Sequence, residues 1–169
     1  MLIVAFSFKV AAVPFHMWAP DVYEGAPTTV TGFMSTAAKA AAFATFLLVF
    51  VRMFEIAGTS LSQVIAIIAA ASMIIGNVTA VAQSSVKRML AYSSVAHAGY
   101  MLSGIAAANS EGETGILFYL LVYSFMNIGA FGVVSWIEHQ DDKKLSFDDY
   151  AGLGERRPAV AALMSIFMF

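Results

Sequence analysis

The chain has 169 residues, of which 60% are hydrophobic and 12% are charged, and its mean hydropathy is +0.78. Soluble domains carry roughly 25% charged residues, and a soluble protein of this size has too little interior to hide so much apolar side chain, so the composition excludes a soluble globular domain and places the chain in a lipid bilayer. The formal net charge of −2 argues against a nucleic-acid partner, and the absence of cysteine excludes disulfides, iron–sulfur clusters and cysteine-ligated zinc.

Apolar segments along the chain predict membrane helices, because about 20 apolar residues are needed to cross the hydrocarbon core. Four segments are long enough to cross the membrane: residues 28–54, 61–82, 88–107 and 115–138. Residues 1–18 are also apolar, and residues 158–169 cover only about 18 Å of helix. We therefore predict an all-α, polytopic transmembrane bundle of about five to six helices, and we expect it to be an internal piece of a longer subunit.

The first segment contains two residues that do not suit a continuous membrane helix, Lys9 and Pro14. Lys9 lies about 13 Å from the Trp18 end of such a helix. Pro14 removes a backbone donor and clashes with the preceding turn, so the helix should kink or break there. Transporters use broken helices beside their ion sites, but a helix that simply ends at the membrane interface near His16 and Trp18 fits the same residues.

Lys39 is the second basic residue inside an apolar segment, about 16 Å from the expected helix start near Thr28. A lysine at this depth costs about 2.5–3.5 kcal/mol on insertion scales. Burial favours its neutral form, so the amine can exchange a proton near neutral pH. The alternatives are snorkelling to the head groups and a structural ion pair with another helix. Because Lys9 and Lys39 are both central, we interpret them as proton-transfer residues.

Polar side chains recur at four-residue spacing on the predicted helices, which places each set on one helix face. Ser35 precedes Lys39 by one turn, and Tyr123 and Asn127 share a face of the fifth helix. His97 is the best-placed titratable group after the lysines, because imidazole changes charge near physiological pH. Such faces can hold a file of water molecules. Equally, Ser bonds its own backbone, Tyr and Asn join helices, and a buried histidine can be structural.

Lysine and arginine are distributed unevenly between the two sides of the predicted bundle. The side with the connections 19–27, 83–88 and 139–157 carries Lys87, Arg88, Lys143, Lys144, Arg156 and Arg157. The other side carries Arg52 at a helix end. By the positive-inside rule, we expect the basic side to be cytoplasmic. The chain has no glycine-rich nucleotide-binding motif, and its histidines lie far apart, so the pattern gives no reason to propose a nucleotide, haem or metal site.

Three stretches resemble subunit N of the proton-translocating NADH:quinone oxidoreductases, the respiratory complex I family. They are KVAAVPFHMWAPDVYEGAPTTVTGFMSTAAKAAAF at 9–43, SSVKRMLAYSSVAHAGYML at 84–102 and IGAFGVVSW at 128–136. The resemblance covers essentially the whole chain. It implies that these residues correspond to the seventh helix through the start of the twelfth in a fourteen-helix, antiporter-like subunit. A glutamate upstream and a lysine downstream would complete the family's proton path.

The resemblance also implies roles for individual residues. Lys9 matches the family's seventh-helix lysine, whose helix is discontinuous, and Lys39 matches the eighth-helix lysine; both are implicated in proton transfer. His97 matches a tenth-helix histidine, for which a relay role is one interpretation. Tyr123 and Asn127 occupy a face that carries histidine and lysine in paralogous subunits. That difference, and the sequence PDVYEGAP in place of the usual PDAH, favour subunit N over the other antiporter-like subunits.

Cofactors and partners follow from the same resemblance. It implies a translocase subunit with no redox centre of its own, and NADH, FMN, iron–sulfur clusters and quinone are expected in partner subunits. The expected partners are other membrane-arm subunits, in the bacterial cytoplasmic (inner) membrane. Two alternatives remain from the residues: a subunit of a multisubunit cation/proton antiporter or related membrane-bound oxidoreductase, and a non-transporting scaffold whose lysines form fixed pairs.

Overall fold

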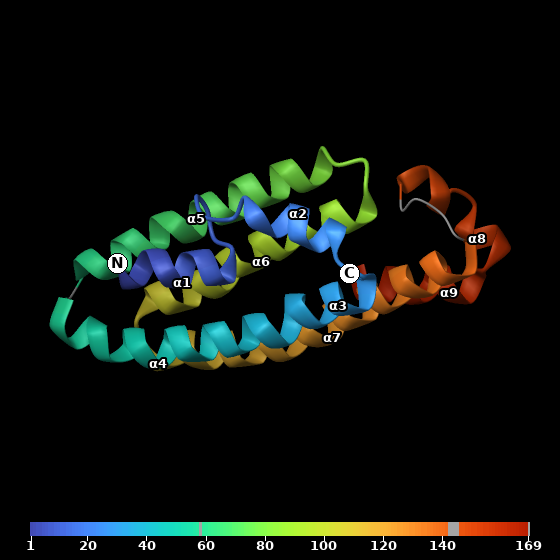
Figure 1. Ribbon diagram of the computed structural model, residues 1–169. Helices are drawn as coiled ribbons and strands as arrows, with labels where there is room; N and C mark the ends of the chain where they lie inside the picture. Colours follow the sequence, from blue (N-terminus) through green and yellow to red (C-terminus); the bar gives the residue numbers. More distant parts are fainter. Residues whose placement is uncertain (58, 142–145, 169) are drawn as a thin grey trace.

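The computed structural model describes residues 1–57, 59–141 and 146–168 as an elongated helical bundle (Figure 1). Its helices are α1 (Leu2–Val10), α2 (Trp18–Gly25), α3 (Thr28–Phe33), α4 (Lys39–Ala57), α5 (Thr59–Val81), α6 (Val86–Ala107), α7 (Ser110–Asp141), α8 (Leu153–Arg156) and α9 (Pro158–Met168). A π-helical segment, η1 (Met34–Ala38), joins α3 to α4, and a 3-10 turn, η2 (Phe147–Tyr150), precedes α8. The all-α membrane bundle predicted from the sequence is confirmed.

The first apolar segment is broken, as Pro14 predicts. Helix α1 ends at Val10, where Ala11 adopts a left-handed conformation (φ 59°), and α2 begins only at Trp18. The 13 Å depth expected for Lys9 assumed one continuous helix through Trp18, so that estimate does not apply. Helix α2 also continues to Gly25, into the stretch expected to be a connection. The chain therefore forms two short helices where the sequence predicted one helix and a loop.

Three described helical stretches are long and apolar enough to cross a membrane: Thr28–Phe50, Ser60–Val81 and Ser110–His139. The predicted span at 88–107 lies in α6, which has 22 residues and is therefore about 33 Å long. Helix α6 carries more polar side chains than the three spans above. It can do so because it packs against other helices, which bury twelve of its 22 residues. A helix shielded from lipid does not need a wholly apolar surface.

The connections with most of the basic residues lie at one end of the bundle, on the right in Figure 1. The Lys87 amine donates to the carbonyl oxygen of Ala26 at 2.8 Å, and the Phe147 amide donates to the carbonyl oxygen of Ser84 at 3.2 Å. These contacts bring the three predicted basic connections together. Lys143 and Lys144, which the charge count also uses, lie outside the described residues, as does the side chain of Arg52.

The apolar core lies where α4, α5 and α6 meet. Its aromatic centre is formed by Phe43 and Phe46 of α4, which are no more than 1% exposed, and by Phe6 of α1, whose ring stacks on Phe46 at 4.9 Å. Ile65 of α5 and Met101 of α6 complete this centre. The core therefore fixes α4 against α5 and α6, and with it the helix turn that carries Lys39.

Candidate functional site

The amine of Lys39 is buried among uncharged groups. Lys39 is 3% exposed, and its Nζ donates to both the backbone carbonyl oxygen and the hydroxyl oxygen of Ser94 on α6. The same Nζ lies 5.8 Å from the ring centroid of Tyr123 on α7, within range of a cation–π interaction. No acidic side chain among the described residues forms an ion pair with it. Lys39 therefore has neutral hydrogen-bond acceptors on α6 in place of a carboxylate.

A π-helical turn lies immediately before Lys39. Within η1, the hydroxyl groups of Ser35 and Thr36 both donate to the carbonyl oxygen of Gly32, each at 2.9 Å. Ser35 therefore bonds its own helix, which is the ordinary role of a buried serine. A π-helical turn rotates the following residues about the helix axis, and such turns are frequent at functional sites. No pattern in the sequence predicted this turn.

Polar and aromatic groups continue from Lys39 along α6 and α7. The His97 ring lies 5.1 Å from the Tyr123 ring, and its Nδ1 lies 2.7 Å from the hydroxyl group of Tyr119. Beyond them, the amide nitrogen of Asn77 on α5 donates to the Tyr100 hydroxyl at 3.1 Å, and the Tyr100 ring lies 5.7 Å from His97. The structure thus brings the predicted residues His97 and Tyr123 into one cluster with Lys39.

Tyr123 and Asn127 of α7 bring two further polar groups to this cluster. Tyr123 interacts with both Ser94 and Asn127, and the Tyr123 hydroxyl and the Asn127 amide nitrogen are buried. These contacts extend the polar surroundings of Lys39 along α7.

Lys9 lies in the last turn of α1, exposed on the described bundle, and lines the same cavity as Lys39. The cavity has a volume of about 440 Å³, and its other lining residues are Phe8, Ala11, Trp18, Val22, Tyr23, Met34 and Ala38. Most of these lining residues are apolar. The structure thus connects the two predicted lysines through one space, without a direct contact between them.

The break around Pro14 is held by neighbouring helices. The amide of Val13 donates to the hydroxyl of Ser72 on α5 at 2.9 Å, and the indole nitrogen of Trp18 donates to the carbonyl oxygen of Phe8 at 3.0 Å. These bonds satisfy backbone groups that the interrupted helix would leave unpaired. The break is thus a fixed feature that places the end of α1, with Lys9, at the cavity.

The sequence pattern did not identify Tyr23 or the contact between Ser94 and Lys39. Tyr23 was expected in a connection, yet it is 2% exposed, lines the cavity, and its carbonyl oxygen accepts a hydrogen bond from Thr31. Ser94 was visible as one of several polar residues on α6. The contact between Ser94 and Lys39 joins residues 55 positions apart. Helix periodicity relates residues of one helix, so it could not predict this contact.

Comparisons with known proteins give one family. The family described as "NADH:quinone oxidoreductase/Mrp antiporter, TM" matches residues 1–169. The chain is 52% identical to the NADH-quinone oxidoreductase subunit N of Salinibacter ruber and 50% identical to that of Trichlorobacter lovleyi. These alignments cover 99% and 100% of this chain but 34% and 35% of the relatives. The chain therefore spans about a third of the length of the curated relatives.

Solved structures give the same fold. A chain of respiratory complex I from Thermus thermophilus is 35% identical, with a TM-score of 0.74, over 99% of this chain and 36% of that one. A chain of the Mrp complex from a Dietzia species is 25% identical, with a TM-score of 0.85, over 96% and 30%. The archaeal membrane-bound sulfane sulfur reductase has a TM-score of 0.91 over 98% and 34%, but at 23% identity this likeness shows the fold alone.

Proposed function

The chain belongs to the NADH:quinone oxidoreductase/Mrp antiporter transmembrane family, and we propose that it is the proton-transfer core of a subunit of the N type in an NADH:quinone oxidoreductase. The observation that carries this proposal is the Lys39 amine, which is 3% exposed and bonded only to uncharged Ser94 among the described residues. The identity of about 50% to subunits named N supports this subunit type over others of the family.

Proton transfer would use the shared cavity of the two lysines. When Lys9 carries a charge, like-charge repulsion across the apolar cavity favours the neutral form of Lys39. The proton that leaves Lys39 can pass to the groups beyond it, toward His97 and Tyr119. A conformational or electrostatic change in a partner subunit would set the charge at Lys9. Redox energy released elsewhere thus becomes a change in the proton affinity of Lys39.

The redox chemistry itself would take place in partner subunits. NADH, FMN, iron–sulfur clusters and quinone would bind there, while this chain supplies the proton path within the membrane arm. The complex would lie in the bacterial cytoplasmic membrane, with the basic end of the bundle on the cytoplasmic side. We propose this topology from the charge distribution and from the gathering of the basic connections at one end.

Inverted membrane vesicles that contain the whole complex test this function. We expect NADH to acidify the vesicle interior, as read by a pH-sensitive dye, in a way that depends on this subunit and not on sodium. The similarity to a chain of an Mrp complex supports a second candidate, a cation/proton antiporter subunit. Sodium-driven proton movement without NADH, and no NADH-driven acidification, would contradict the first proposal and favour the second.

The hydrogen bond between His97 and Tyr119 predicts a smaller, separate effect. Replacing Tyr119 with phenylalanine removes the hydroxyl group 2.7 Å from His97 Nδ1 and leaves the ring in place. If His97 relays protons, we expect the pumping rate to fall about threefold to tenfold, because a hydrogen bond of this kind contributes about 0.5–1.5 kcal/mol. Tyr92→Phe, on the same end of α6 as Lys87 and Arg88, is the matched control. Equal pumping in Tyr119→Phe and wild type would rule out this relay.

A further inference from the structure

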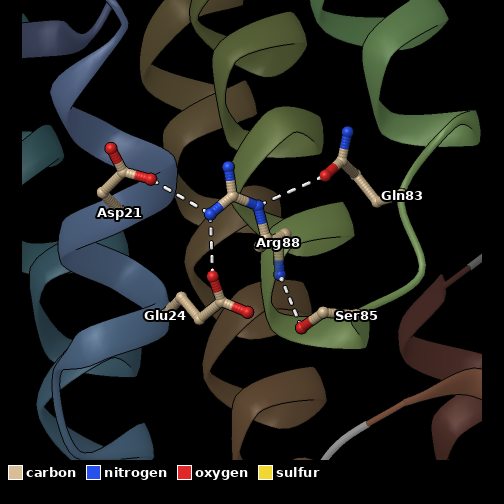
Figure 2. Close-up of polar contacts among 5 residues, drawn as sticks. All are labelled: Asp21, Glu24, Gln83, Ser85 and Arg88. Carbon is tan, nitrogen blue, oxygen red and sulfur yellow. Dashed lines mark hydrogen bonds and ion pairs between the residues drawn. The ribbon is translucent and has the colours of Figure 1, made fainter.

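Two adjacent cations at the start of α6 bind the same short helix, α2. Figure 2 shows the first of them: an Arg88 guanidinium nitrogen lies 3.0 Å from a carboxylate oxygen of Asp21 and 2.7 Å from one of Glu24. Arg88 Nε also donates to the side-chain oxygen of Gln83 at 3.3 Å. The guanidinium therefore joins both acidic side chains of α2 to the connection between α5 and α6.

The second cation, Lys87, binds the C-terminal end of α2. Its Nζ donates to the carbonyl oxygen of Ala26, the C-cap residue of that helix, at 2.8 Å, and Lys87 is only 5% exposed. Carbonyl groups at a helix C-terminus lack helical partners and carry partial negative charge, so a buried cation is stabilised there. Arg88 thus holds the side of α2, and Lys87 holds its end.

Helix α2 forms one wall of the cavity between Lys9 and Lys39. Trp18, Val22 and Tyr23, three of its eight residues, line that cavity. A helix of this length is not stable by itself, and the break before it removes the support of a continuous helix. The position of the wall therefore depends on the contacts that α2 makes with its neighbours, chiefly α6.

We propose that Lys87 and Arg88 are positioning residues that hold α2 against α6, and so keep Trp18, Val22 and Tyr23 in place as one wall of the cavity between Lys9 and Lys39. Neither residue contacts the Lys39 amine; they act through Tyr23 and its neighbours on α2. The consequence for pumping rests on the proposed function, because water that enters when this wall moves would screen the two amines from each other. The position of this wall can be measured without any transport.

The two cations should contribute unequally. The ion pairs of Arg88 join side chains that are 31%, 74% and 42% exposed, and exposed pairs are screened by water and salt. The Lys87 amine is buried, so its removal leaves the C-terminal carbonyl of α2 without a charged donor. We therefore expect Lys87→Gln to loosen α2 more than Arg88→Gln does.

Thiol labelling of the assembled complex, read by mass spectrometry on the peptide that carries an introduced cysteine, tests the proposal, because these 169 residues contain no cysteine of their own. Ala11 lines the cavity of the two lysines and is 1% exposed, whereas its neighbour Ala12 is equally buried but does not line the cavity. Ala11→Cys is therefore the reporter, and Ala12→Cys is its matched control. We expect Lys87→Gln to raise the rate at which N-ethylmaleimide labels the reporter thiol about tenfold, the factor expected when a charged hydrogen bond is lost, and Arg88→Gln to raise it less.

Three further variants separate positioning from general disruption. Lys87→Arg keeps a cation and should restore slow labelling, and Arg88→Glu combined with Glu24→Arg should label more slowly than Arg88→Glu alone. Arg156→Gln, an exposed arginine of α8, should change nothing. Unchanged labelling of the reporter thiol in Lys87→Gln, or an equal rise at the control thiol, would overturn the proposal. If labelling follows the prediction while Lys39 variants still pump normally, the positioning role stands and the proposed function fails.

Discussion

Replacing Lys39 with arginine is expected to lower NADH-driven proton pumping about tenfold or more in a complex that still assembles. Arginine keeps the positive charge and can still donate to Ser94, but a guanidinium does not release its proton near neutral pH. A residue that must lose and regain a proton cannot be replaced in this way. The measurement is the number of protons pumped per NADH oxidised, in vesicles whose content of assembled complex has been checked.

A second variant at the same position separates the alternative roles of this lysine. Lys39→Met removes the charge and keeps a similar length of chain. If the amine is a proton carrier, both variants lose pumping. If it is only a structural cation, arginine retains function and methionine does not. If the bundle is a scaffold that transports nothing, neither variant changes pumping. Near-normal pumping in Lys39→Arg would therefore contradict proton transfer through this amine.

Adding a single methyl group at Gly99 is expected to destabilise the bundle. Helices α5 and α6 approach closely there: a Cβ on residue 99 would lie 2.8 Å from both the Ala69 carbonyl oxygen and the Met73 backbone nitrogen. Non-bonded carbon contacts are favourable only at about 3.5 Å or more. Because the obstructing atoms are backbone, the helices must move apart. We expect Gly99→Ala to lower the free energy of unfolding by about 1–3 kcal/mol, as overpacking does in other protein cores.

The helix separation should also affect the functional site, because α6 carries Ser94 and His97. The measurements are the amount of assembled complex in the membrane and its thermal unfolding temperature in detergent. Gly115→Ala is the matched control, since a Cβ there would meet no atom within 4 Å. That variant should be neutral or slightly stabilising, because alanine favours helix more than glycine does. Equal behaviour of the two variants would show that close packing at Gly99 is not needed.

Much of the architecture followed from the sequence because it depends on local composition. Apolar segments of sufficient length predicted the helices, and Pro14 predicted the break, since a proline disturbs its own turn whatever surrounds it. The alternation of helices and connections predicted which connections share an end of the bundle. Lys39 stood out because it is a lysine eleven residues into an apolar helix, and it is 3% exposed.

The site itself required the tertiary structure, because its contacts join residues that are remote in the chain. Helix periodicity states which residues share a face, but it does not state which helix that face meets. The bond from Lys39 to Ser94 joins residues 55 positions apart, and that from Lys87 to Ala26 joins residues 61 apart. Residues 19–27 were expected to form a connection between apolar segments, but most of them form helix α2. Asp21 and Glu24 of that helix pair with Arg88 of α6, and only the packed bundle brings these residues together.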